Sequence, residues 1–221
     1  MYIVLENNDI KNSEEWHKNR NKQIGGSECA AVVGLSPYMT NIDLFMKKTG
    51  KKKPEDISSK PYVYYGTHAE EPLRALFALK HPEYNVYYKP FDVRKSKKYD
   101  FIGASLDGEI EEIESKKRGI YEGKTAIVNN REELRKWLEG NIPQQYYCQL
   151  LHNMYAADAE FAEINAEIMP SWYENESIIK SFRIERSKVV EDIDYLISAE
   201  VEFWNNHILT GKCPALKLPE I

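Results

Sequence analysis

The chain has 221 residues, of which 42% are hydrophobic and 29% are charged, and its formal net charge at pH 7 is -5. This length suits one domain over residues 1–221, with the composition of an ordinary soluble protein. No apolar run approaches the ~18 residues of a membrane span, and the N-terminus lacks the features of a signal peptide, so we expect a cytoplasmic protein without membrane contact. The acidic total argues mildly against a nucleic-acid partner, but basic clusters at residues 47–53, 94–98 and 116–118 could still hold phosphates.

Two short helices are predicted near the N-terminus. Residues 13–20 form the first, with Ser13 as its cap. The sequence I-G-G-S-E-C-A-A-V-V-G then places Ser27 as the N-cap of a helix of small residues that ends at Gly34. Glycines and an arginine, Arg20, beside a helix N-terminus are typical of an anion site, and equally of a cap with tight packing.

Two further helices follow. One spans Thr40–Lys48, and a longer one begins after Gly66, ends before Pro82 and carries Pro72 in its first turns, where proline is tolerated. Glu70 and Arg74 lie four residues apart on one face of that helix. By default this is a surface ion pair, although Glu70 could also face a carboxylate cluster.

The stretch from Phe101 to Val128 predicts two short apolar strands joined by a charged hairpin loop. Asp107 ends the first strand, and Glu122 and Lys124 project from one face of the second, because strand residues two apart share a face. Two carboxylates at a buried sheet end are costly unless a cation compensates them. Asp107, Glu122 and the backbone carbonyl of Gly123 supply the oxygen ligands that Mg2+ prefers, with Mn2+ as a substitute.

These residues outline a phosphodiesterase site. A bound metal ion would activate water and stabilise charge on the phosphate, while Lys124 would orient the water or neutralise the developing charge. The alternative is an ordinary ion pair worth under about 1 kcal/mol, because E-x-K is a common triplet. A second copy, Glu114-Ser115-Lys116, lies in a run of charges typical of a solvated loop.

The remaining elements complete an α/β pattern. A strand over Asn85–Val93 precedes the hairpin; after it come helices at 130–139, capped by Asn130 and Glu133, and at 144–157, strands at 161–168 and 177–184, and a helix at 187–207. This order predicts a central mixed β-sheet flanked by helices. Gln149, on the helix over 144–157, is by default a surface amide.

Several common chemistries have no support in the sequence. There is no phosphate-binding G-x-x-x-x-G-K-[ST] loop, no G-x-G-x-x-G after a strand and no G-x-S-x-G elbow. The five histidines show no metal-pair spacing. Cys29, Cys148 and Cys213 are too far apart to indicate a disulfide framework or a zinc site, so Cys29 and Cys148 are predicted to be small buried residues.

Six short motifs in order resemble the phage-type recombination exonucleases of the YqaJ and lambda-exonuclease family, within the PD-(D/E)XK superfamily of restriction-endonuclease-like nucleases. They span residues 20–149 and read as follows: Arg20 with I-G-G-S ending at Ser27, G-L-S-P-Y, Gly66-x-x-x-Glu70 with Arg74, S-L-D-G, E-G-K-T and I-P-Q-Q-Y-Y-C-Q. Each motif is weak alone, and their order is fairly specific.

The resemblance implies a role for each matching residue. Asp107, Glu122, Lys124 and Glu70 correspond to the catalytic and metal-binding group. The 5′-phosphate and DNA contacts correspond to Arg20, Ser27, Ser105 and Gln149. Glu70 is favoured over Glu71 by its distance from Gly66. Members of the family digest one strand of linear double-stranded DNA from its 5′ end with magnesium, which leaves 3′ tails for recombination.

The resemblance also implies partners and a source. Many members form ring-shaped trimers around DNA and work with a single-strand annealing protein, and they are encoded by phages or prophages. Basic residues lining such a ring would reconcile DNA binding with an acidic chain.

Two positions depart from the family pattern. Leu106 replaces a proline, and Gly123 replaces a branched apolar residue, which loosens the strand. Two alternatives therefore stay open. The protein could be a structure- or sequence-selective endonuclease, or a DNA-binding or recombinase-docking module whose site has decayed at Gly123.

Overall fold

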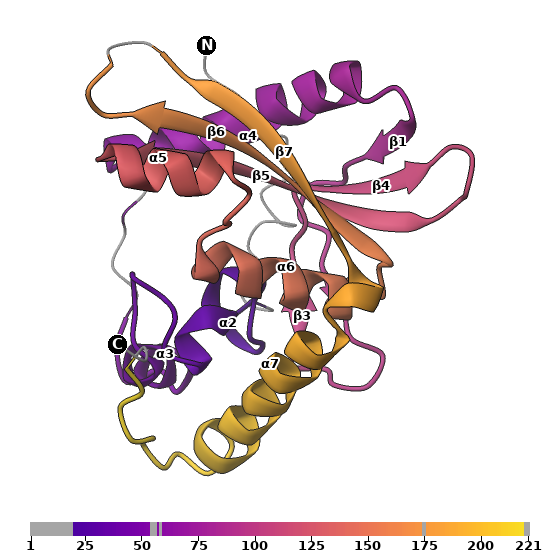
Figure 1. Cartoon of the computed structure of the whole chain (residues 1–221). Helices are drawn as coiled ribbons and strands as arrows, with labels where there is room; N and C mark the ends of the chain where they lie inside the picture. Colours follow the sequence, from indigo (N-terminus) through magenta and orange to yellow (C-terminus); the bar gives the residue numbers. More distant parts are fainter. Residues whose placement is uncertain (1–19, 54–56, 58, 174–175, 219–221) are drawn as a thin grey trace, which may run out of the picture.

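The computed structural model describes residues 20–53, 57, 59–173 and 176–218 and has a mixed β-sheet at its centre (Figure 1). Five strands form this sheet in the order β1-β4-β5-β6-β7. Their bounds are Tyr84–Tyr87 (β1), Gly108–Glu112 (β4), Arg118–Val128 (β5), Phe161–Pro170 (β6) and Ile178–Glu185 (β7). Strand β5 pairs antiparallel with β4 and parallel with β6. The predicted α/β class with a central mixed sheet is confirmed.

Helices pack on both faces of the sheet: α4 (Pro61–Lys80) on one face, and α5 (Arg131–Leu138) and α6 (Gln144–Ala157) on the other. Helices α2 (Gly26–Val32), α3 (Asn41–Lys48) and α7 (Val190–Phe203) form a further layer, in which α2 and α7 pack against α6 and α3 packs against α2. Tyr121 of β5 packs with Phe77 of α4, whereas Ile120 belongs to the larger core formed with α2, α6 and α7. Because side chains alternate along a strand, the even-numbered residues of β5 face α6. None of the helices in the described ranges is both long and apolar enough to cross a bilayer.

The predicted position of the first hairpin strand is wrong. Gly103–Ala104 form β3, which pairs with β2 (Arg94–Lys95) in a separate two-stranded sheet. The partner of β5 is instead β4, which begins immediately after Asp107. In β4, Ile110 is buried and the glutamates beside it are partly exposed, which is the alternation of a strand with one covered face.

The start of two predicted helices is also wrong. Gly25, not Ser27, is the N-cap of α2, and Ser27 lies in its first turn. Helix α4 begins at Pro61, because proline is favoured at the first helical position, so Pro72 lies in the helix interior.

Other boundaries vary in accuracy. The strand predicted over Asn85–Val93 ends at Tyr87, and Phe91 has a positive φ of 59°, which no strand accommodates. The predicted bounds of α6 are confirmed, and Asn130 caps α5 by accepting a hydrogen bond from the Glu133 N–H at 2.8 Å. The helix predicted from residue 187 begins at Val190, because a 3-10 turn over Arg186–Lys188 precedes it. The helix predicted over 13–20 falls outside the described residues except for Arg20.

A buried ion pair joins α6, α7 and β3. His152 Nδ1 lies 2.9 Å from the Glu200 carboxylate, and His152 Nε2 lies 3.0 Å from the carbonyl of Gly103. Burial alone would lower the pKa of His152, but Glu200 more than offsets it and the pKa is raised. Cys29 lies within 4.8 Å of this pair. Because hydrogen-bond acceptors contact both ring nitrogens of His152, we interpret the cluster of Cys29, His152 and Glu200 as structural. Cys29 and Cys148 are both buried, as predicted.

We expect His152→Gln to destabilise the fold by about 3–5 kcal/mol, because it leaves the Glu200 carboxylate buried without its cation. Relative to the double variant His152→Gln/Glu200→Gln, the wild-type protein should hold its full extra stability below about pH 6.5, the unfolded-state pKa of histidine. That extra stability should fall as pH rises through the raised folded-state pKa. Urea unfolding of the wild-type protein, the single variant and the double variant, from below pH 6.5 upward, measures these free energies of unfolding. A difference between the wild-type protein and the double variant that does not change with pH would contradict the prediction.

Candidate active site

The structure brings eight of the nine candidate site residues to one cavity of about 480 Å3, whereas Gly123, the ninth, is not among the residues that line it. It lies where α2, α4 and α6 meet the start of β4 and the middle of β5. The eight residues that line it are Arg20, Ser27, Glu70, Ser105, Asp107, Glu122, Lys124 and Gln149.

Glu122 lies at the buried end of the cavity and is 1% exposed. Its Oε1 accepts hydrogen bonds from Lys124 Nζ and Gln149 Nε2, both at 2.6 Å. Its Oε2 accepts one from Asn153 Nδ2 at 3.0 Å. The default interpretation of Gln149 as a surface amide is therefore wrong, because α6 directs it into the cavity.

Asp107 faces an open edge of β5. Pairing with β4 ends at Gly108 and Tyr121, and beyond that point the Asp107 carboxylate accepts the Gly123 N–H at 3.0 Å. The N–H and C=O of one strand residue point to the same side, as the paired bonds of a ladder require. The Gly123 carbonyl therefore faces the same edge as Asp107, and with Glu122 nearby the cavity offers oxygen donors from three residues.

The cavity brings the carboxyl groups of Glu70, Asp107 and Glu122 together, so that ionising one of them disfavours ionising the next. Burial, and then repulsion from Asp107, raises the pKa of Glu122 to about 8 and that of Glu70 to about 7. Burial alone would lower the pKa of Lys124, but Glu122 and Asp107 raise it overall, so Lys124 is a cation. The carboxylates of Asp107 and Glu122 and the carbonyl of Gly123 are oxygen ligands of the kind that Mg2+ prefers, so this set fits Mg2+.

Glu70 and Arg74 do not form the surface pair that is their default interpretation. Glu70 lines the cavity, whereas Glu71 is exposed and does not. Arg74 donates to the main-chain carbonyl of Asp107 at 2.8 Å and stacks on Tyr88, with the guanidinium carbon 3.7 Å from the ring centre. Arg74 therefore fixes the turn that presents Asp107.

The candidate phosphate contacts lie toward α2. Arg20 donates to the Ser27 hydroxyl at 2.9 Å, which places a cation and a hydroxyl side by side on the cavity wall. Ser105 lies on the same wall, with its hydroxyl 3.5 Å from the carbonyl of Asp92.

Asn153 is a site residue that the sequence reasoning missed. It lies one helical turn after Gln149 on α6, so a Q-x-x-x-N spacing was the available signal. Its Oδ1 is buried and, among the described residues, has no hydrogen-bond partner. A Cβ at Gly26 would lie 2.2 Å from that oxygen, so the glycine permits α2 to approach α6 here.

Comparison with solved structures identifies the fold as that of phage-type exonucleases. LHK-Exo, an alkaline exonuclease from Laribacter hongkongensis crystallised alone and in complex with dAMP, superposes with a TM-score of 0.63 at 17% identity, covering 90% of this chain and 96% of its own in the dAMP complex. A phage-related exonuclease from Haemophilus somnus 129PT gives a TM-score of 0.51 at 14% identity, over 86% of this chain and 96% of its own. At these identities the likeness shows the fold.

Sequence comparison then shows the family. Residues 15–160 match the model of the YqaJ-like viral recombinase domain, and the chain belongs to that family. The uncharacterized protein YqaJ of Bacillus subtilis (strain 168) is 29% identical over 225 aligned residues, which cover 96% of this chain. The chain spans 62% of the length of that relative. The resemblance predicted from the motifs is confirmed at the level of family and fold.

We expect Gly123→Ala to stabilise the protein by about 0.5–1 kcal/mol, because glycine is unfavourable within a strand. A Cβ at Gly123 would meet Tyr121 Oη at 3.4 Å and Asp107 Oδ2 at 3.8 Å, both ordinary contacts. Gly119→Ala in the same strand is the matched control, since its Cβ would lie 2.5 Å from the Phe161 ring and should destabilise the protein. Urea unfolding tests both variants, and destabilisation by Gly123→Ala would show that the glycine is required.

We expect Asn153→Ala to weaken Mn2+ binding about 10–100-fold, because hydrogen bonds to a metal-binding carboxylate set its orientation. Calorimetric titration with Mn2+ measures this affinity. Asn165→Ala is the control, because Asn165 is an equally buried amide that bonds Leu73, Tyr121 and Ser181 and touches no carboxylate of the cavity. Equal Mn2+ affinities for wild-type protein and Asn153→Ala would contradict a positioning role.

Proposed function

We propose that this chain is a magnesium-dependent deoxyribonuclease that digests one strand of linear double-stranded DNA from its 5′ end and leaves 3′ single-stranded tails for recombination. The observation that carries the proposal is the meeting of Asp107, Glu122 and Lys124 in one cavity with Arg20 and Ser27. Membership of a viral recombinase family supports the recombination setting.

Asp107, Glu122 and the Gly123 carbonyl would hold the metal. When bound, Mg2+ supplies a nucleophile at neutral pH and stabilises charge on a phosphate undergoing displacement. Mn2+ would substitute, since it also accepts carboxylate and carbonyl ligands. Lys124, Gln149 and Asn153 keep the Glu122 carboxylate in one orientation before any substrate enters, which limits the reorganisation that the reaction requires.

Lys124 acts as a hydrogen-bond donor in this mechanism. The neighbouring Glu122 and Asp107 carboxylates raise its pKa, which favours the protonated form that donates hydrogen bonds. A protonated amine in this place orients the attacking water and neutralises charge that develops on the phosphate oxygens. Glu70, from α4, also lines the cavity and completes the acidic group.

Arg20 and Ser27 would bind the 5′-terminal phosphate, with Ser105 and Gln149 as further contacts. A cation beside a hydroxyl is a suitable anion receptor, and each cut would present a new 5′-phosphate to it. Repeated capture of that phosphate favours stepwise digestion. By family resemblance we also propose a homo-oligomeric ring, a single-strand annealing protein as partner, and a phage or prophage origin.

The test is degradation of end-labelled linear duplex DNA, with either a 5′-phosphate or a 5′-hydroxyl, in magnesium and in EDTA. Lys124→Ala should slow magnesium-dependent digestion by about 10²–10³-fold, the usual cost of losing one donor to a developing oxyanion. Lys116→Ala, in the exposed second E-x-K triplet, should leave the rate unchanged.

Other outcomes would favour the alternatives. Cutting of closed circular DNA would indicate an endonuclease. A folded protein that binds DNA and digests none of these substrates would indicate a docking module. Equal rates on 5′-phosphate and 5′-hydroxyl ends would contradict the phosphate-binding role of Arg20 and Ser27.

A further inference from the structure

Basic residues from three separate segments of the chain meet at a second hollow of about 310 Å3. Six of the residues that line it are cationic, and among the lining residues Asp158 is the sole carboxylate. The six are Arg94, Lys95, Lys97, Lys98, Arg118 and Arg186. Two of the basic clusters seen in the sequence, at 94–98 and 116–118, therefore contribute to one surface, which we call the basic hollow.

Internal ion pairs take up part of this charge. Asp158 binds Lys97 at 2.8 Å and Arg186 at 3.2 Å. Glu109 binds Arg94 and, at 3.4 Å, Arg118. These pairs are partly or largely exposed, so a stronger anion can compete with them.

Two of the lysines are not part of these pairs. Within the described part of the chain, Lys95 and Lys98 are exposed and form no ion pair with a carboxylate. In the third basic cluster, at 47–53, Lys47 and Lys48 turn inward to the buried Glu28 at 2.7 Å, and Lys52 pairs with Asp43 at 3.0 Å. The basic hollow differs in that its cations line one concave surface and include two exposed lysines that can bind an external anion.

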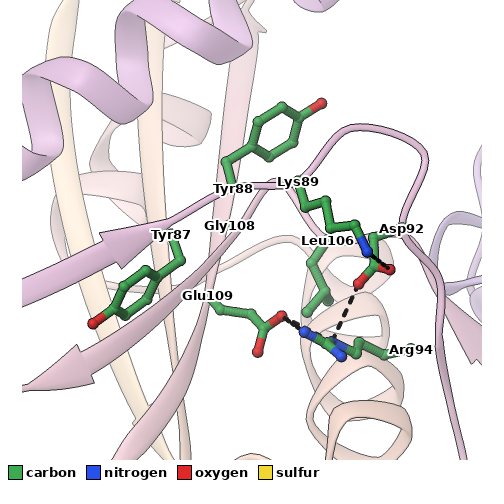
Figure 2. Close-up of a pocket in the computed structure, with 8 residues that line it drawn as sticks. All are labelled: Tyr87, Tyr88, Lys89, Asp92, Arg94, Leu106, Gly108 and Glu109. Atoms are coloured by element: carbon green, nitrogen blue, oxygen red, sulfur yellow. Dashed lines mark hydrogen bonds and ion pairs between the residues drawn. The ribbon is translucent and has the colours of Figure 1, made fainter. Parts of the chain in front are cut away.

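A smaller hollow connects the basic hollow with the active site (Figure 2). Arg94 lines both this hollow, of about 120 Å3, and the basic hollow. Tyr88 and Leu106 line both this hollow and the catalytic cavity. Figure 2 shows Tyr88 and Arg94 at opposite sides, with Leu106 between them. The three hollows thus follow one another along the surface.

The separation suits a nucleic acid backbone. Arg118 and Glu122 are four residues apart on β5, which corresponds to about 13 Å. One strand of B-form DNA rises about 3.4 Å along the helix axis per nucleotide and also winds around that axis, so its neighbouring phosphates lie about 7 Å apart in space. A separation of about 13 Å therefore spans about two nucleotides. An acidic protein segment would match the charge, but it would give no reason for a continuous path into the catalytic cavity.

We propose that the basic hollow binds the sugar–phosphate backbone of the DNA substrate about two nucleotides from the bond that is cut. Resting on the proposed function, this inference adds a second anchoring point beyond the cavity. Phosphates entering the hollow would replace Asp158 and Glu109 as partners of the cations and release counterions, so this contribution to binding is sensitive to salt.

The test measures binding of a fluorescent linear duplex to the full chain in EDTA, where no digestion occurs, at several salt concentrations. Lys95→Ala/Lys98→Ala should weaken binding roughly tenfold at about 0.1 M salt and lower the slope of log K against log salt by about two. This pair leaves no carboxylate without its partner. Lys80→Ala/Lys180→Ala, two exposed lysines outside the three hollows, is the matched control and should behave as wild type.

The outcomes separate this inference from the proposed function. Unchanged binding by Lys95→Ala/Lys98→Ala, while wild-type protein digests DNA, would overturn the anchoring role alone. Weaker binding by that variant, with no digestion by wild-type protein, would support the anchor and reject the nuclease. An equal loss of DNA affinity in the control variant would overturn the inference in favour of a general charge effect. Displacement of the DNA by polyglutamate at equivalent charge would overturn it in favour of an acidic protein partner.

Discussion

Burial of the Glu122 carboxylate is the constraint on which the rest of the cavity depends. Ionising a carboxyl group with 1% exposure is costly unless hydrogen bonds and opposite charge replace its lost water, and this cost raises the pKa of Glu122. Lys124 provides the charge from the same strand, while Gln149 and Asn153 provide two further donors from α6. The position of α6 over β5 is thus tied to the ionic state of one side chain.

Helix α6 also connects this carboxylate to the opposite side of the core. His152, next to Asn153, turns away from the cavity and binds Glu200 of α7 and the carbonyl of Gly103. Gly103 lies on the segment that leads to Asp107, so one turn of α6 holds both carboxylate-bearing segments. Packed, hydrogen-bonded groups therefore connect α7 with the cavity.

Local signals were the part of the structure that the sequence predicted well. The bounds of α6 and the Asn130 cap depend on neighbouring residues, and the E-x-K triplet shows its shared face through strand alternation alone. The first hairpin strand was misplaced because an apolar run can be buried without joining the main sheet. Asn153 was missed, and the meeting of Arg94 with Arg118 and Arg186 was not foreseen, because tertiary contacts decide which amide or cation faces which surface.

The open edge of β5 beyond Tyr121 affects the solubility of the protein as well as the chemistry of the cavity. A strand edge with free N–H and C=O groups invites pairing with another chain, and proteins protect such edges with inward-pointing charges. The Asp107 carboxylate accepts a hydrogen bond from the Gly123 N–H at this edge, so an acidic side chain covers one of its donors. The residue that would bind the metal therefore also protects this part of the sheet against edge-to-edge association, so that a substitution chosen to remove metal binding would also expose the strand edge.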